Sequence, residues 1–157
     1  MEFSRPEAYI RQLTEYLRQN AFGEAFALGK EGSAKFSKNV LVHFLYAKAA
    51  FGLRNFDLSA KECRIAVNLA STKEDIVFCA VFEASALYEL GKFNEGFERL
   101  CTVEHLQKNA DVNANVEKLL FIFSLAKNDL NTAMNHLDLL AVLNPAMADE
   151  LTLKFLS

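Results

Sequence analysis

The sequence contains no tryptophan and few residues that interrupt helices, with two prolines and six glycines among 157 residues. Sandwiches and barrels of β-strands need many turns, and turns draw on glycine and proline. The scarcity of both residues therefore favours long helices over a fold of strands. Apolar residues make up 52% of the chain, which excludes the composition of a disordered protein. A chain of this length fits a single folded domain.

Cysteine is also scarce, and Cys63, Cys79 and Cys101 are far apart, without a C-x-x-C pair. This odd number at wide spacing argues against a disulfide framework and against a zinc site, and favours a reducing compartment. The N-terminus lacks the apolar stretch of a signal peptide, and no run approaches the roughly 18 apolar residues of a membrane span. We therefore expect a soluble, intracellular protein of the cytoplasm, with the nucleus left open.

Charge is unevenly placed, since residues 1–78 carry eleven basic and nine acidic side chains whereas residues 79–157 carry six and eleven, which we interpret as a solvated helix surface rather than as a site for a basic partner. The 17 lysines and arginines and 20 aspartates and glutamates give a net charge of −3. Nucleic-acid binding would need basic residues clustered on one face, and none appears. Together with the lack of a membrane-spanning run, this predicts neither a nucleic acid nor a membrane as a partner.

The motifs of common catalytic sites are missing as well. His43, His105 and His136 are separate in the sequence, and none begins an H-E-x-x-H pattern, so we expect surface or core histidines rather than metal ligands. There is no G-x-G-x-x-G, phosphate loop or G-x-S-x-G. Cys63 falls at a helix-packing position, where a buried thiol is inert. The chain is therefore predicted to be no enzyme and to hold no cofactor. The alternative, an enzyme or a small-ligand binder without a known motif, would need an enclosed polar pocket.

The chain does contain a pattern that recurs four times. A large residue is followed three positions later by a small one in Phe22/Ala25, Phe56/Ser59, Phe93/Gly96 and Leu130/Ala133, and these anchors stand 34, 37 and 37 residues apart. A period of this size is typical of an array of helix–turn–helix units, in which the small residue lets two helices cross closely.

Apolar residues recurring at three and four positions, together with the turn residues, predict nine helices. Ser71 with Glu74 offers a capping box for the fifth helix, Gly91 ends it, and Asp111 is a candidate cap for the seventh. Asn144-Pro145 ends the eighth. The expected ranges are about 6–19, 22–36, 40–53, 56–69, 72–90, 93–106, 112–127, 130–143 and 146–156.

These repeats resemble the tetratricopeptide repeat family, whose unit of about 34 residues is a pair of antiparallel helices with small and large residues at set places. The second repeat carries the pattern at Ala47, Phe56, Ser59, Cys63 and Ala66. The third carries it at Ala84, Phe93, Gly96 and Leu100, and the fourth at Leu130, Ala133, Leu137 and Pro145. The departures from the pattern are Leu13, Gly29, Gly32 and Phe121.

The resemblance implies an all-α fold, a right-handed α–α superhelix of about four repeats within a single domain over 1–157. The repeats would cover about 6–37, 40–71, 75–108 and 112–145, and a capping helix would cover 146–156. Arrays of this family serve as scaffolds in many settings. The resemblance therefore implies a non-catalytic protein–protein interaction module.

The family turns one helix of each repeat toward a concave surface, and carrying that pattern over gives a candidate partner-binding set. Its members are Ile10, Thr14, Leu17, Phe44, Lys48, Phe51, Phe78, Val81, Ser85, Tyr88, Lys118, Ile122 and Leu125. The set is apolar and aromatic with two lysines, which disfavours a clamp for acidic C-terminal peptides. The aromatic residues either pack inside the superhelix or form an exposed groove for a partner helix, a partner segment or a second copy of this chain. We favour partner binding.

Two settings remain open for such a module. In the first, the chain is a scaffold subunit, homodimeric or bound to other proteins, in a larger assembly such as a cell-cycle ubiquitin ligase of the anaphase-promoting type. In the second, it is a small cytoplasmic chaperone for a secreted protein, as in type III secretion. Those chaperones usually have fewer repeats than the four counted here.

Overall fold

The computed structural model describes residues 3–106 and 108–157, and these residues confirm the predicted all-α class. They form helices and no strand. The helices are α1 (Pro6–Arg18), α2 (Phe22–Lys35), α3 (Val40–Gly52), α4 (Phe56–Leu69), α5 (Lys73–Glu89), α6 (Phe93–Val103), α7 (Ala110–Ala126), α8 (Leu130–Leu143) and α9 (Pro145–Phe155). None of them combines the length and the apolarity that crossing a membrane requires.

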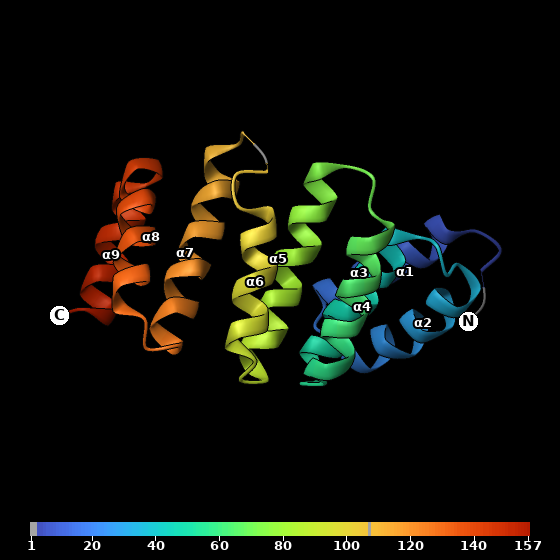
Figure 1. The fold of residues 1–157 in the computed structure, drawn as a ribbon. Coiled ribbons are helices and arrows are strands. Elements are labelled where there is room, and N and C mark those ends of the chain that lie inside the picture. Colours follow the sequence, from blue (N-terminus) through green and yellow to red (C-terminus); the bar gives the residue numbers. More distant parts are fainter. Residues whose placement is uncertain (1–2, 107) are drawn as a thin grey trace. The chain divides into compact units, whose positions relative to one another are not determined.

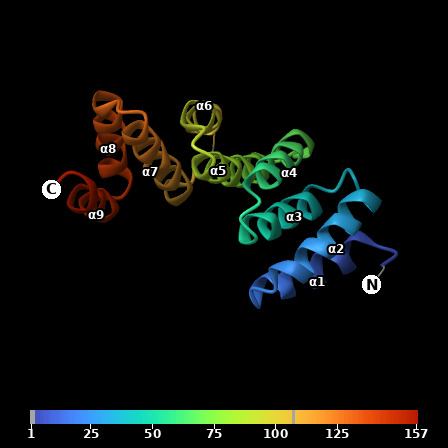
Figure 2. The ribbon, with the colours of Figure 1, turned by 90° about the horizontal axis from the view of Figure 1, so that it is seen from below.

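The chain divides into two units, unit 1 (Met1–Leu90) with α1 to α5 and unit 2 (Gly91–Ser157) with α6 to α9. In unit 1 each helix packs against the next, and α1 also contacts α3 (Figure 1). Figure 2 shows α1, α2 and α3 lying side by side. In unit 2, α6 packs on α7, α7 on α8 and α8 on α9. The boundary falls inside the predicted third repeat, and the single domain and the right-handed superhelix stay predictions.

Polar side chains fix the starts of most helices by accepting a hydrogen bond from a backbone N–H of the first turn. For α5 the predicted capping box of Ser71 and Glu74 is wrong, because the Thr72 hydroxyl oxygen accepts from the Asp75 N–H at 3.1 Å. Thr72 has the extended backbone of a cap residue, with φ −104° and ψ 148°. Equivalent bonds are made by Asn39, Asn55, Asn109, Asp129 and Asn144.

Two other predicted helix ends also need correction. The cap of α7 is Asn109 and not Asp111, since the Asn109 side chain accepts from the backbone N–H groups of Asp111 and Val112 at 2.9 and 3.1 Å. Asp111 itself lies in the first turn, where its charge favours the helix N-terminus. Helix α6 ends at Val103, three residues before the predicted end at Leu106, because the next residue, Glu104, leaves helical geometry with ψ 125°.

Single residues in the left-handed region follow four of the helices. They recur with the spacing of the sequence pattern and have φ between 56° and 74°: Asn20, Arg54, Gly91 and Asn128. The predicted end of α5 at Gly91 is therefore confirmed. His105, with φ 62°, is the one other residue with positive φ in the described ranges, and it lies outside this series.

The four small residues of the repeated pattern, Ala25, Ser59, Gly96 and Ala133, are all buried. The Ser59 hydroxyl donates to the carbonyl oxygen of Ala47 at 2.9 Å, which joins α4 to α3 where they cross. Gly29 and Gly32, which depart from the family pattern, leave room for neighbouring aromatic rings. A Cβ on Gly29 would lie 2.7 Å from the Tyr46 ring, and one on Gly32 would lie 2.9 Å from the Tyr9 ring.

The core of unit 2 lies between α7, α8 and α9. Phe121, which departs from the family pattern, is fully buried there beside Ala133 and Leu140. Its ring meets Phe155 of α9 edge to face, with 6.0 Å between the centroids. Leu151 of α9 belongs to the same core, and α9 packs against α8 within this unit.

Candidate functional site

Unit 1 contains two hollows along α3 and α5. The larger, of about 480 Å³, is lined by Thr14, Leu17, Arg18, Asn20, Phe22, Leu45, Lys48, Phe51, Gly52 and Phe82. The smaller, of about 280 Å³, is lined by Val40, Leu41, Phe44, Glu74, Asp75, Phe78 and Cys79. We call these two hollows, with the aromatic residues that connect them, the α3–α5 groove.

Aromatic side chains form the middle of the groove. The ring of Phe82 on α5 meets Phe44 and Phe51 of α3 edge to face, with centroids 5.5 and 5.2 Å apart. Phe44 lines the smaller hollow, whereas Phe51 and Phe82 line the larger one. Because edge-to-face rings hold each other in preferred positions, this stack gives the groove a preformed apolar floor.

The two hollows of the groove differ in charge. Arg18 and Lys48 line the larger hollow, and no acidic side chain of the described residues does so. Glu74 and Asp75 line the smaller hollow, and there the described lining includes no basic side chain. Arg18 pairs with Glu15 at 2.7 Å, and Lys48 Nζ lies 5.5 Å from the centroid of the Phe44 ring. The described lining of the larger hollow therefore includes basic side chains, and that of the smaller hollow includes carboxylates.

The structure brings six members of the predicted partner-binding set to this groove: Thr14, Leu17, Phe44, Lys48, Phe51 and Phe78. Phe78 is 56% exposed, whereas Phe44 and Phe51 are half-buried in the aromatic stack. Phe44 and Phe51 are thus packed and Phe78 is exposed, and binding of a partner by this set stays a prediction.

The remaining members of the set lie elsewhere. Ile10 packs against the core of α1 and α2, and the Ser85 hydroxyl donates to the carbonyl oxygen of Val81. Tyr88 is 38% exposed at the end of α5. Lys118, Ile122 and Leu125 belong to unit 2, where Ile122 and Leu125 pack against the core.

Several residues that line the groove were missed by sequence reasoning. Phe82 is the most important, since it joins the two hollows, and its position four residues after Phe78 places both on one face of α5. The family pattern favours 78, 81, 85 and 88 instead. Arg18 is the last residue of α1, and Asn20 lies in the turn that follows, where helical periodicity gives no signal.

Two buried histidine–glutamate pairs stand at matching places in the two units. His43 Nδ1 lies 2.5 Å from Glu62 Oε2 across α3 and α4, and His136 Nδ1 lies 2.6 Å from Glu117 Oε2 across α8 and α7. Members of each pair are 19 positions apart, but the order of histidine and glutamate is reversed. This equal spacing of 19 positions is present in the sequence, but a search for known motifs does not detect it.

The expectation of an inert Cys63 agrees with its surroundings. Burial raises the pKa of the Cys63 thiol far above its ordinary value, and burial raises that of Cys79 to about 11. Thiols with such pKa values remain protonated near neutral pH and are poor nucleophiles. Cys101 is the exposed cysteine of the three.

The groove thus combines an aromatic floor with basic side chains in the lining of one hollow and carboxylates in the lining of the other. Comparison of this chain with models of known protein families finds no match, and comparison with curated proteins finds none either.

Proposed function

We propose that this protein is a non-catalytic protein-interaction module built from tetratricopeptide-like repeats, and that its α3–α5 groove binds an apolar segment of another protein. The observation that carries the proposal is the aromatic floor of Phe44, Phe51 and Phe82 beside the exposed Phe78. Exposed aromatic residues lining a hollow are typical of surfaces that bind a partner.

The repeat character is supported by the regular recurrence of left-handed backbone geometry at Asn20, Arg54, Gly91 and Asn128, which matches the spacing of the four large–small pairs. Repeat proteins commonly bind partners on an extended surface made by successive units. A subunit of a larger assembly would use the groove in this way.

The charges of the groove indicate the chemistry of its occupant. A segment with apolar side chains in the middle, an acidic residue at one end and a basic residue at the other would complement Arg18 and Lys48 at one end and Glu74 and Asp75 at the other. Helix α3 has 13 residues and is therefore about 20 Å long, which matches a helical segment of similar length.

The test is a selection of displayed random peptides of about 13 residues, a length that as a helix spans about 20 Å. We expect the enriched peptides to combine apolar residues with an acidic residue near one end. The double change Phe44→Glu with Phe78→Glu should abolish their binding, because it places charges on the apolar floor. Circular dichroism should show unchanged helix content.

The matched control is Val142→Glu, which adds the same charge at an 83% exposed apolar residue of α8 in unit 2. This variant should bind the selected peptides as the unchanged chain does. If the groove variant binds equally well, or if no peptide is enriched, the groove is not the binding surface.

A second copy of this chain is the competing occupant of the groove. Light scattering after size exclusion, over roughly a hundredfold dilution, separates the two cases because self-association follows mass action. We expect a monomer over the whole range. A dimer that the Phe44→Glu and Phe78→Glu changes dissociate would assign the groove to self-association.

The chaperone hypothesis places a segment of a secreted protein in the same groove. Its distinguishing result is a client that is insoluble when expressed alone and soluble when expressed with this chain. A scaffold subunit would instead bind a partner that is already folded and soluble. Co-expression of a partner identified with the selected peptides decides between the two.

A further inference from the structure

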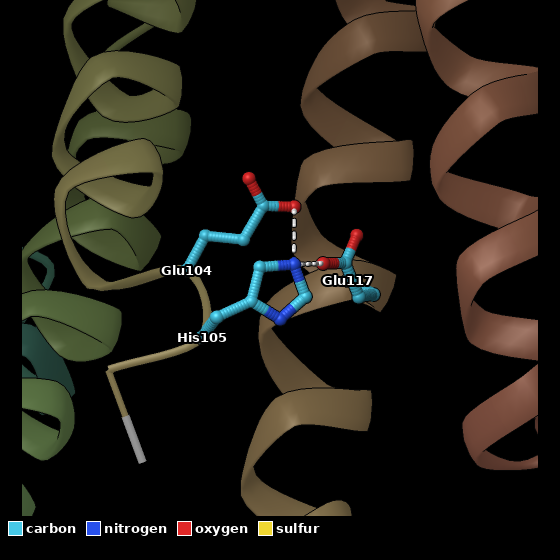
Figure 3. Close-up of side chains that lie close together, drawn as sticks. All are labelled: Glu104, His105 and Glu117. Atoms are coloured by element: carbon cyan, nitrogen blue, oxygen red, sulfur yellow. Dashed lines mark ion pairs between the residues drawn. The ribbon is translucent and has the colours of Figure 1, made fainter. Parts of the chain in front are cut away.

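Unit 2 brings together three side chains that can ligate a metal ion. Glu104 and His105 follow the end of α6, and Glu117 lies on α7 (Figure 3). His105 Nε2 lies 3.9 Å from Glu104 Oε2 and 3.7 Å from Glu117 Oε1, so the imidazole nitrogen faces both carboxylates. Within residues 3–106 and 108–157, this is the one group of three His, Cys, Asp or Glu side chains whose ligand atoms all lie within 4.8 Å of one another.

Glu117 supplies an independent indication of a ligand. Its side chain is 1% exposed, and its Oε1 atom has no hydrogen-bond partner among the described residues, although it faces the cluster. The other oxygen, Oε2, is held by His136 Nδ1 at 2.6 Å. A buried carboxylate oxygen without a hydrogen bond is costly, and a bound cation would remove that cost.

The charges of the cluster agree with this indication. Burial, together with the neighbouring Glu117, raises the pKa of Glu104 to about 7. Burial also acts to raise the pKa of Glu117, but the hydrogen bonds with His136 and Glu104 and the charges of the nearby histidines together outweigh it and lower that pKa. Independently of these shifts, both carboxylates face the same imidazole nitrogen, at 3.9 and 3.7 Å, and a divalent cation bound there would neutralise both.

We propose that Glu104 Oε2, His105 Nε2 and Glu117 Oε1 bind one Zn²⁺ ion, with solvent completing a tetrahedral site. Ligand atoms about 2.1 Å from a tetrahedral Zn²⁺ lie about 3.4 Å from each other. The separations of His105 Nε2 from the two carboxylate oxygens, 3.9 and 3.7 Å, exceed this by a few tenths of an ångström, and all three ligand atoms lie within 4.8 Å of one another. Imidazole nitrogen favours Zn²⁺ over Mg²⁺ and Ca²⁺, which take oxygen ligands.

His136 acts as the positioning residue of this site. By donating from Nδ1 to Glu117 Oε2, it turns Oε1 toward His105. A group that holds a ligating carboxylate in this manner is typical of zinc sites. The pair of His43 and Glu62 has the same kind of hydrogen bond but belongs to no such cluster, and so provides a matched control within the same chain.

The experiment is a titration of the full chain with Zn²⁺, followed by calorimetry, with Mg²⁺ and Ca²⁺ as comparison ions. We expect one Zn²⁺ per chain and no comparable binding of the other two ions. His105→Ala should weaken binding at least tenfold, because loss of even an outer partner of a zinc ligand costs about 10-fold to 100-fold. The His105 side chain is 60% exposed, so this variant should remain folded.

Further variants separate this site from adventitious binding. Glu104→Gln should weaken binding like His105→Ala, whereas His43→Gln should leave the affinity unchanged. Cys101→Ser should also leave it unchanged, since the exposed thiol is not among the three ligands. Replacing Zn²⁺ by Co²⁺ should give the strong visible absorption of a tetrahedral site.

The proposal is overturned by any of three results. One is a chain that binds no Zn²⁺ or binds Mg²⁺ and Ca²⁺ equally well. Another is unchanged affinity in both His105→Ala and Glu104→Gln while circular dichroism shows both variants folded. The third is loss of binding in Cys101→Ser, which would place the ion on the thiol.

Discussion

Gly96 of α6 lies directly against the ring of Phe123 on α7. A Cβ atom at Gly96 would stand 2.3 Å from Phe123 Cε1, closer than carbon atoms can approach. Phe123 is fully buried, so its ring has little room to move away. The absence of a side chain at residue 96 is therefore what allows α6 and α7 to pack within unit 2.

Replacing Gly96 by leucine should destabilise the protein by about 1–3 kcal/mol, because overpacking forces the neighbouring helix to shift. Urea denaturation followed by circular dichroism measures this change. Gly23 of α2 is the control, since a Cβ there meets no atom within 4 Å. Gly23→Ala should be neutral or stabilising by up to about 1 kcal/mol. A neutral Gly96→Leu would contradict the close contact.

The stability provided by His43 should fall as the pH rises. Hydrogen bonding to Glu62 raises the pKa of His43, assisted by the Ser37 carbonyl and opposed by burial. Both ring nitrogens face oxygen atoms, which suits the protonated ring with two donors. A histidine with a raised folded-state pKa stabilises fully below its unfolded pKa of about 6.5 and loses this contribution as the pH passes the folded value.

The measurement compares the unfolding free energy of the unchanged chain with that of His43→Gln between about pH 6 and pH 9, a range that begins below the unfolded pKa of histidine. The difference should shrink as the pH rises. Tyr46 is the other titratable group near this pair, through Glu62, and the pKa of its hydroxyl is raised by burial, so it stays neutral over this range. A difference that grows with pH would show that His43 is not protonated in the folded state.

The start of α5 can be tested with two neighbouring residues. Thr72→Ala should cost about 1 kcal/mol, because it removes the hydroxyl that accepts from the Asp75 N–H. Ser71→Ala should change the unfolding free energy by far less, since the cap is formed by the next residue. Chemical denaturation of both variants measures the two unfolding free energies. A larger loss of stability in Ser71→Ala than in Thr72→Ala would show that Ser71 forms the cap.

Thiol reactivity should distinguish Cys101 from Cys63 and Cys79. Cys101 is exposed, whereas Cys63 and Cys79 are buried, and burial raises the pKa of all three thiols, far above the ordinary value for Cys63 and to about 11 for Cys79. An aromatic disulfide reagent near pH 8 should modify one thiol per folded chain quickly and the other two only in denaturant. Cys101→Ser should abolish the fast phase, and a fast phase of two or three thiols would show that the buried cysteines are accessible.

The helices were predicted well because their signals are local. The range of α4 and of α8 agrees with the prediction at both ends, and the left-handed Gly91 was recognised from its residue type. The caps at Thr72 and Asn109 were missed because two polar residues stand close together at each start, and backbone geometry selects between them. Arg54 shows a similar limit, since nothing in an arginine predicts positive φ.

The sites were predicted less completely, because they join residues from several helices. The family pattern identified the groove residues Phe44, Lys48 and Phe51 on α3, whereas it did not include Phe82, which lies four residues after Phe78. Glu104, His105 and Glu117 come together only when α6 and α7 pack. The separation of the three histidines and the lack of an H-E-x-x-H pattern had argued against metal ligands, which is a weak argument when the other ligands lie on an adjacent helix.

The reversed order of the two buried pairs restricts how these repeats can diverge. His43 bonds to Glu62 and Glu117 to His136, so both orders of histidine and glutamate are tolerated at this place between two helices. A single substitution that converts one order toward the other would bury two carboxylates or two imidazoles side by side, which is unfavourable. The two positions of each pair should therefore covary during evolution, and we expect related chains to change both residues together.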